Sequence, residues 1–420
     1  MSFQQGLSGL NATSKSLEVI GNNIANANTY GAKGSRAEFA DMYANALNGG
    51  GGLNIGIGVN LDTVSQQFTQ GNITATENPM DLAINGGGFF QLTDGQSPVT
   101  YSRNGQFKVD SSGYIVNNDN LQLMGYAADL QGVIQPGLAV PLQLPTAGIA
   151  PNATTEINME FNLDSRLAVT DPGDGVSPRI DFTDANTYNK ATSLTVYDTK
   201  GQTVALTYYY QKSATDVWNV YVTANGTPIG GTEDAPEPLT TLQFEEGGAN
   251  PTPSAVTLDI PASTNSAGAE TLAISGIDLD FGQSTQFGSA FAVTNLKQDG
   301  YAPGSLTGIV VEENGIITAR YSNGQSKPAG QVELATFRNL QGLQPVGANG
   351  WQRTYASGDP IVGTPAVGNL GSLQAGALEE SNVDLTGELV NMITAQRNYQ
   401  ANAQTIKTMD QVMQTLVNLR

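Results

Sequence analysis

Both ends of this 420-residue chain carry apolar or small residues in alternating steps of four and three, the spacing of a coiled-coil seam. Near the N-terminus, the residues at this spacing are Phe3, Leu7, Leu10, Ser14, Leu17, Gly21 and Ile24. The pattern predicts a helix over residues 3–24, because residues spaced in this way line one face of a helix. A residue as small as Gly21 in the seam would let a neighbouring helix approach closely.

The C-terminal segment repeats the same spacing over a longer stretch. Its seam residues are Leu385, Leu389, Met392, Gln396, Tyr399, Ala403, Ile406, Asp410, Met413 and Val417. They predict a helix over 385–419, with Asp384 as its N-cap and Glu388 placed favourably for the helix dipole. Polar residues at Gln396 and Asp410 make this seam less regular than that of a two-stranded zipper.

Isolated helices with narrow apolar stripes are marginally stable in water, so each terminal helix needs a partner. One possibility is that the two helices pair within one chain as an ordinary α-helical hairpin. The other is that they fold and pair only on assembly with other copies, and are poorly ordered in the free monomer.

The residues between the two helical segments show the signals of strands and turns. Asn314-Gly315 separates two apolar runs and is the strongest hairpin signal in the chain. Further turns are predicted at 199–202, at Asn225-Gly226 and at Asn104-Gly105. The fold class we expect is mixed and mainly β, with two β-rich domains in tandem nested between N- and C-terminal α-helices that pair in a coiled-coil-like core.

Charge is distributed unevenly along the chain, which carries a net charge of −20. Residues 146–289 hold 18 acidic and 5 basic residues, and therefore account for −13 of this charge. An acidic region of this kind is typical of a solvated outer surface. If the terminal helices lie together, the chain must run outward through one β region and return, so this region would be an outer insertion.

These considerations predict a nested domain organisation. We expect a helical core domain, a linker region, a discontinuous inner β domain and an outer β domain. Their residues are 1–30 with 385–420, 31–70 with 359–384, 71–145 with 290–358, and 146–289, respectively. The glycine run Gly49–Gly52 lies in a flexible connection, and it lacks the Lys-Ser/Thr of a phosphate-binding loop.

Composition excludes several classes of function. The chain has no Cys and no His, which removes thiol chemistry, the commonest general base and the commonest zinc ligand. A net charge of −20 argues against binding to nucleic acid or to an anionic membrane. No apolar run is long enough to insert into a membrane, and the first thirty residues lack the basic segment of a secretory signal peptide.

The acidic pairs Glu245-Glu246 and Glu312-Glu313 are poor catalytic candidates, because adjacent residues on a strand point to opposite faces. We therefore expect no enzyme, no cofactor and no metal site. A soluble structural or binding protein fits the composition better.

Three motifs resemble one known family. The first is residues 21–43, GNNIANANTYGAKGSRAEFADMY, and the second is residues 101–107, YSRNGQF. The third is residues 376–385, GALEESNVDL, followed by residues 395–402, AQRNYQAN. Together they resemble the signatures of the bacterial flagellar axial proteins, which form the rod, the hook and the hook-associated segments. The residues that carry the N-terminal signature are Asn22, Asn23, Asn26, Thr29, Gly31 and Lys33.

The resemblance implies a structural subunit of a helical polymer, with the terminal helices innermost. The large central insertion fits the hook members, whose curved flexible tube is a universal joint between the basal body rod and the filament. Implied partners are other copies of the chain, the hook cap, distal rod and hook–filament junction proteins, and the flagellar type III export apparatus. The implied location is the flagellum basal body and hook, outside the cell after export. The alternatives are another axial protein, such as a distal rod protein, and a secreted β-rich adhesin with helical ends.

The resemblance also singles out a short apolar segment. Phe39, Met42 and Tyr43 resemble a hydrophobic motif that flagellar axial substrates present to the export gate. The alternative is that these side chains pack the linker onto its own domain. The assembly surface is expected on the helix stripes, at Phe3, Leu7, Leu10, Leu17, Ile24, Leu385, Leu389, Met392, Tyr399, Ile406, Met413 and Val417.

Overall fold

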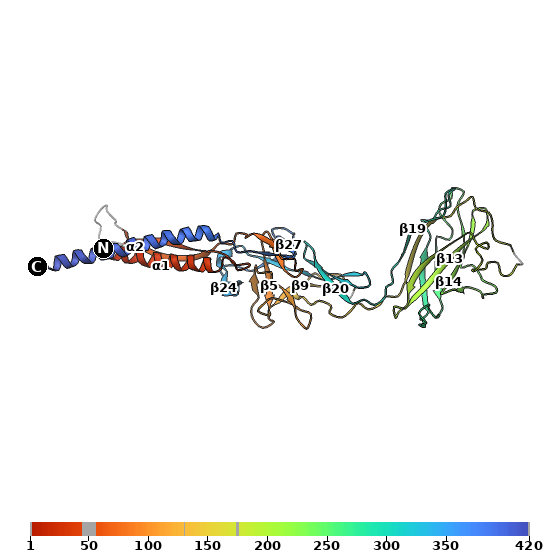
Figure 1. The fold of residues 1–420 in the computed structure, drawn as a ribbon, viewed down its shortest axis with the longest axis horizontal. Coiled ribbons are helices and arrows are strands. Elements are labelled where there is room, and N and C mark those ends of the chain that lie inside the picture. Colours follow the sequence, from red (N-terminus) through yellow and green to blue (C-terminus); the bar gives the residue numbers. More distant parts are fainter. Residues whose placement is uncertain (1, 44–55, 130, 174–175, 419–420) are drawn as a thin grey trace. The chain divides into compact units, whose positions relative to one another are not determined.

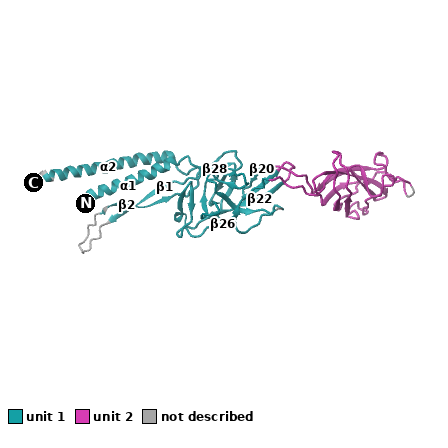
Figure 2. Cartoon of the chain, turned by 90° about the horizontal axis from the view of Figure 1, so that it is seen from below, with its two compact units in different colours: residues 1–146, 307–320, 326–420 teal, residues 147–306, 321–325 magenta. Residues whose placement is uncertain are grey.

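The computed structural model describes residues 2–43, 56–129, 131–173 and 176–418, so the Gly49–Gly52 run lies outside the described residues. The chain divides into two compact units, shown in different colours in Figure 2. Unit 1 holds residues 1–146, 307–320 and 326–420, and unit 2 holds residues 147–306 and 321–325. Each unit has its own hydrophobic core.

Two long helices form one end of unit 1 and lie side by side (Figure 1). Helix α1 spans Ser2–Ala25 and helix α2 spans Leu385–Asn418, within a residue or two of the predicted ranges. Asp384 caps α2, since its Oδ1 accepts a hydrogen bond from the Thr386 N–H at 3.0 Å. Because α1 and α2 lie in contact, the prediction that the terminal helices pair is confirmed.

A two-stranded antiparallel ribbon follows α1. It consists of β1 (Ser35–Tyr43) and β2 (Gly56–Gln66). A lone two-stranded ribbon is marginal in water, and this one is supported by packing against α1. The Gln5 Nε2 donates to the Gly56 carbonyl at 2.6 Å, and the Val59 N–H donates to the Ser8 Oγ at 3.3 Å.

The rest of unit 1 is built on one 13-stranded sheet with the path β20-β21-β22-β9-β5-β6-β25-β24. Strands off this path are β7, β8, β10, β23 and β26. The bounds along the path are Leu306–Val311, Ile316–Tyr321, Ser326–Val332, Gln122–Ala127, Phe89–Thr93, Thr100–Ser102, Gly350–Gln352 and Gln344–Gly347. The others are Lys108–Val109, Ile115–Val116, Val140–Pro141, Leu334–Thr336 and Ile361–Gly363, and a 3₁₀ turn spans Leu340–Gly342.

Two small antiparallel sheets join chain segments that are far apart in the sequence. Strand β4 (Leu82–Asn85) pairs with β27 (Ser372–Ala375), and β3 (Ile73–Ala75) pairs with β28 (Ala377–Glu379). These pairings hold the returning chain just before α2 against the chain that leaves the ribbon.

Unit 2 is a sandwich of two sheets. One has the order β17-β18-β11-β19, and the other has the order β12-β13-β14-β15 with β16 also paired to β14. The bounds of β11 to β19 are Glu156–Asn162, Lys190–Tyr197, Thr203–Ala214, Val217–Ala224, Thr227–Ile229, Thr240–Gln243, Ala255–Ile260, Ile274–Asp280 and Ala292–Gln298. Side chains from both sheets form a single core that includes Trp218, Tyr210 and Phe161.

The predicted hairpins are present at three of the four turn signals. Asn314-Gly315 joins β20 to β21, with Gly315 at φ +83°, and Asn225-Gly226 joins β14 to β15. The 199–202 turn joins β12 to β13 in register, with Tyr197 opposite Thr203. The segment around Asn104-Gly105 is different, because the flanking strands β6 and β7 pair with other strands.

The expected boundary of the outer domain at residue 289 differs from the structure. Strand β19 pairs antiparallel with β11 and completes a sheet of unit 2, which extends to residue 306. Sequence inspection missed this because β19 is half exposed and has no strict apolar alternation. The other edge of the insertion, expected at 145/146, lies at 146/147.

Gly105 gives a test of the fold of unit 1. A side chain at this position would collide with the carbonyl oxygen of Leu82. The two segments lie this close because the Leu82 N–H donates a hydrogen bond to the Gly105 carbonyl at 3.0 Å. We expect Gly105→Ala to lower the free energy of unfolding of unit 1 by about 2 kcal/mol or more. Gly137→Ala is the matched control, because nothing lies within 4 Å of the added atom.

Fluorescence of Trp351 measures this effect in unit 1 alone when Trp218, the tryptophan of unit 2, is replaced by Phe. Equal denaturation midpoints for the Gly105 and Gly137 variants would contradict the predicted collision.

Candidate assembly surface and the junction behind it

Three motifs that are far apart in the sequence meet at one buried carboxylate, that of Glu379. The Lys33 Nζ lies 2.6 Å from the Glu379 Oε1, and the Arg103 Nη1 lies 3.0 Å from the Oε2. The side chains of Lys33 and Glu379 are fully buried, and that of Arg103 is 5% exposed. The N-terminal, central and C-terminal motifs are thus joined by a single ionic cluster.

Hydrogen bonds to the backbone complete this cluster. The Lys33 Nζ also donates to the Thr69 carbonyl at 2.8 Å, and the Arg103 Nη2 donates to the Gly86 carbonyl at 2.8 Å. The Glu379 carboxylate accepts the Gly71 N–H at 3.0 Å. The buried charges therefore tie the start of the ribbon, the sheet and the strand before α2 to one another.

Burial determines the electrostatics of the cluster. It lowers the pKa of Lys33, and the neighbouring Glu379 carboxylate opposes this change by favouring the charged amine. Burial also lowers the pKa of Arg103, again against the effect of Glu379. A buried charge that loses its partner is strongly destabilised, so each member of the cluster depends on the others.

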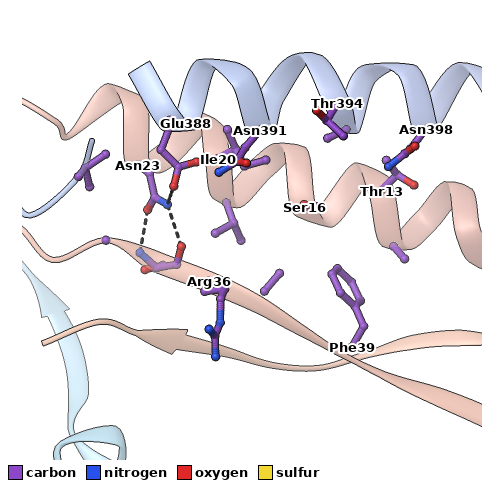
Figure 3. A pocket seen from close by; sticks show the side chains of 18 of the residues that line it. Thr13, Ser16, Ile20, Asn23, Arg36, Phe39, Glu388, Asn391, Thr394 and Asn398 are labelled. Carbon is purple, nitrogen blue, oxygen red and sulfur yellow. Dashed lines mark hydrogen bonds between the residues drawn. The ribbon is translucent and has the colours of Figure 1, made fainter. Parts of the chain in front are cut away.

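Amide side chains of the signature hold the adjoining turn. The Asn23 Nδ2 donates to the Ser35 carbonyl and its Oδ1 accepts the Ser35 N–H, both at 2.8 Å, so Asn23 pairs with the backbone as a strand would (Figure 3). Asn382 accepts the Gly34 N–H at 2.8 Å and donates to the Gln67 carbonyl at 2.7 Å. These bonds fix where the chain leaves α1 and enters β1.

The other signature residues shape the same turn. The Asn26 Nδ2 donates to the Asn22 carbonyl at 2.9 Å, and the Thr29 N–H donates to the Asn26 carbonyl at 3.0 Å. Gly31 has φ +71° and packs against the backbone of Asn104, so a side chain at this position would not fit.

The contact between α1 and α2 uses small and polar residues. Gly6 faces Ile406, with 3.2 Å from an ideal Cβ position to the Ile406 Cγ1. Gly9 lies against Asn402, whose Nδ2 donates to the Thr13 Oγ1 at 3.4 Å. Gly6 and Gly9, rather than Gly21, allow the close approach, since nothing lies within 4 Å of a Cβ at Gly21.

The contact face of α1 is displaced from the predicted apolar stripe by one residue. Each contact residue comes one position before a residue of the stripe: Gly6 before Leu7, Gly9 before Leu10, Thr13 before Ser14 and Asn23 before Ile24. One position along a helix is a rotation of about 100°. The predicted stripe of α1 therefore lies to one side of the contact with α2.

The apolar stripes of both helices are exposed or half exposed. Phe3, Leu7, Leu385, Leu389, Tyr399, Met413 and Val417 are exposed, and Leu10, Leu17, Ile24, Met392 and Ile406 are half buried. Ile406 is the member of the predicted α2 stripe that packs against α1 at a glycine. We call these twelve residues the helix rows. Apolar rows with this exposure are typical of a contact surface for another molecule.

The expected export motif lies on β1. Phe39 and Met42 are exposed in the ribbon.

Other kinds of site find little support in the part of the chain that the structure describes. Across these residues, no group of three or more acidic side chains is placed to hold a metal ion. None of the described helices is long and apolar enough to cross a membrane.

Family models of flagellar proteins match both ends of the chain and its middle. They are the flagella basal body rod protein (residues 3–33), the flagellar hook protein FlgE/F/G D1 domain (83–205), the flagellar basal body protein FlaE D2 domain (162–301) and the flagellar basal body rod FlgEFG protein C-terminal model (374–419). The chain is therefore a flagellar axial protein, as the motifs implied.

Curated relatives identify the branch of this class. The chain is 43% identical to the flagellar hook protein FlgE of Salmonella typhimurium and 41% identical to that of Escherichia coli, with full coverage of both chains in each comparison. It belongs to the flagellar hook protein FlgE family. The crystal structure of Helicobacter pylori FlgE2 shares the fold, with a TM-score of 0.51 at 15% identity, over 73% of this chain and 100% of that chain.

The buried cluster predicts the effect of neutralising its carboxylate. Glu379→Gln leaves Lys33 and Arg103 buried without a counter-charge, so we expect unit 1 to lose about 3–5 kcal/mol of unfolding free energy. Glu38→Gln is the control, since Glu38 forms an exposed pair with Arg36 and we expect little change. Urea denaturation measures both variants, and similar midpoints would show that the cluster does not hold unit 1 together.

Proposed function

We propose that this chain is the structural subunit of the flagellar hook, polymerising into a curved flexible tube that transmits torque from the basal body rod to the filament. The observation that carries the proposal is the exposure of the helix rows on paired helices. Membership of the hook protein family supports it. In this role the chain acts mechanically rather than as an enzyme.

Burial of the helix rows provides the driving force for assembly. Each row side chain that passes from partly exposed to buried contributes on the order of 1 kcal/mol. Several such side chains on each copy, repeated over many neighbours, make a tube that must lose many contacts before it breaks. Apolar contacts have little directionality, so they tolerate the small shifts that bending requires.

The junction and unit 2 have complementary roles in this proposal. The buried cluster at Glu379 keeps the helices and the inner sheet in a fixed relation, so that force on one reaches the other. Unit 2 carries most of the negative charge and many Asn, Thr and Ser residues. Such a surface can exchange polar and water-mediated contacts at low cost as neighbours slide.

The partners and route follow from the same proposal. We place the subunit between distal rod and hook–filament junction proteins, assembled beneath a hook cap after export through the flagellar type III apparatus. A chain without Cys needs no oxidative folding outside the cell. The exposure of Phe39 and Met42 supports the proposed contact of the segment Phe39, Met42 and Tyr43 with the export gate.

Electron microscopy of the concentrated or seeded protein tests this function. The hook proposal expects tubes, whereas an adhesin with helical ends would remain monomeric. A straight, rigid tube would favour the alternative of a distal rod protein.

Leu389→Glu tests whether the helix rows drive assembly. A carboxylate at this exposed position would be buried without a partner in the tube, so we expect polymers to be lost while both units stay folded. Gln404→Glu is the control, because Gln404 is exposed and polar and lies outside the predicted seam. Normal tubes from the Leu389 variant in electron micrographs would refute the role of this row.

Limited proteolysis of the monomer tests the order of folding. The α1–α2 contact has few large apolar side chains, so we expect residues 1–30 and 385–420 to be cleaved before either β unit in the free chain. The same segments should resist the protease in tubes. Termini as resistant as the β units in the monomer would show that the helix pair is stable alone.

A further inference from the structure

A groove runs along the paired helices of unit 1 and has no occupant among the described residues. It is bounded by α1, α2 and β1, and its volume is about 940 Å³. The ribbon contacts α1 near Gln5 and again at Asn23, and the groove lies between these contacts. Figure 3 shows Ser16, Phe39 and Asn391 lining it from the three elements.

The lining of this groove combines small residues with one incompletely bonded acid. Small side chains such as Gly9, Ala12, Ser16 and Ala395 leave room for larger side chains of another molecule. The Glu388 Oε1 accepts a hydrogen bond from Asn23 at 3.3 Å, whereas the buried Oε2 has no partner. A buried acceptor of this kind favours an occupant that brings a donor.

The same chain carries a segment that complements the groove. Gly6 faces Ile406 and α1 begins at Ser2, so α2 continues past α1 beyond about Asp410 (Figure 1). We call Asp410–Asn418 the overhang. Its side chains Val412, Met413 and Val417 are 52%, 62% and 72% exposed.

The overhang also carries a polar group that matches one of the groove. Gln411 brings an amide donor, which the Glu388 Oε2 lacks. Large apolar side chains on one surface and small ones on the other make the two surfaces complementary in shape.

We infer that the overhang of one copy docks in the groove of a second copy, an inference that rests on the proposed polymerisation. A single chain cannot make this contact. Within one chain, Thr13 faces Asn402 and Asn23 faces Glu388, so Ser16 lies opposite the part of α2 between Glu388 and Asn402. Met413 is more than ten residues farther along α2, which is more than about 15 Å of helix. A contact between two different surfaces repeats from copy to copy and gives an open polymer.

A disulfide test separates this inference from the proposed function, because the chain has no Cys of its own. Tubes are grown under reducing conditions from a Met413→Cys, Ser16→Cys variant and then oxidised. We expect a ladder of covalent oligomers on a non-reducing gel. Met413→Cys with Lys15→Cys is the matched control, since Lys15 neighbours Ser16 but does not line the groove.

Tubes that form but give no ladder, or give the same ladder with the Lys15 control, would overturn the groove contact and leave the hook proposal standing. Wild-type protein that forms no tubes would instead count against the hook proposal. A second pair of variants covers the case in which the cysteines block growth. Ser16→Trp fills the groove and should raise the critical concentration for assembly at least about tenfold. Lys15→Trp should leave the critical concentration unchanged. Equal effects of the two variants would also overturn the inference.

Discussion

The rest of the account depends on the way α1 and α2 meet. Gly6, Gly9, Thr13 and Asn402 form much of the contact, so the helix backbones come close and Ile406 is the row residue that packs at a glycine. Phe3, Leu389 and five other members of the helix rows remain exposed, and the rest are half buried. In the proposed polymer, such a helix pair gains stability when another copy covers its apolar surface.

The Glu379 cluster has the opposite character, because it is completed within one chain. Its two cations and one carboxylate are buried and bonded to backbone groups, which makes the contact costly to disturb. The chain therefore has a firmly specified junction next to a helix pair that is incomplete alone. This combination suits a subunit that passes force from one element to the next while its outer contacts remain adjustable.

Local sequence patterns predicted the elements well, and they predicted contacts between distant segments poorly. The four–three spacing predicted both helices, and Asn-Gly pairs marked two of the hairpins, because these signals depend on neighbouring residues alone. The same spacing did not reveal that α1 turns its glycines toward α2, since that choice depends on how closely two backbones can approach. Strand β19 was missed because its partner β11 lies more than 130 residues earlier in the chain.

The meeting of Lys33, Arg103 and Glu379 was also beyond the reach of the sequence, although each lies in a motif that was noted. One signal was present: charged residues are only 13% of the chain, and yet each of these motifs contains at least one. A charge in a motif of a charge-poor chain suggests a specific partner, but the spacing does not say which partner it is.

Hydroxyl-radical footprinting of monomers and tubes tests the central claim most directly. The claim is that other copies cover the helix rows. In tubes, the oxidation of Phe3, Tyr399 and Met413 should fall to the low level of the core residues Tyr101 and Phe89, while in monomers it should be high. Equal oxidation of Phe3, Tyr399 and Met413 in monomers and tubes would contradict the account.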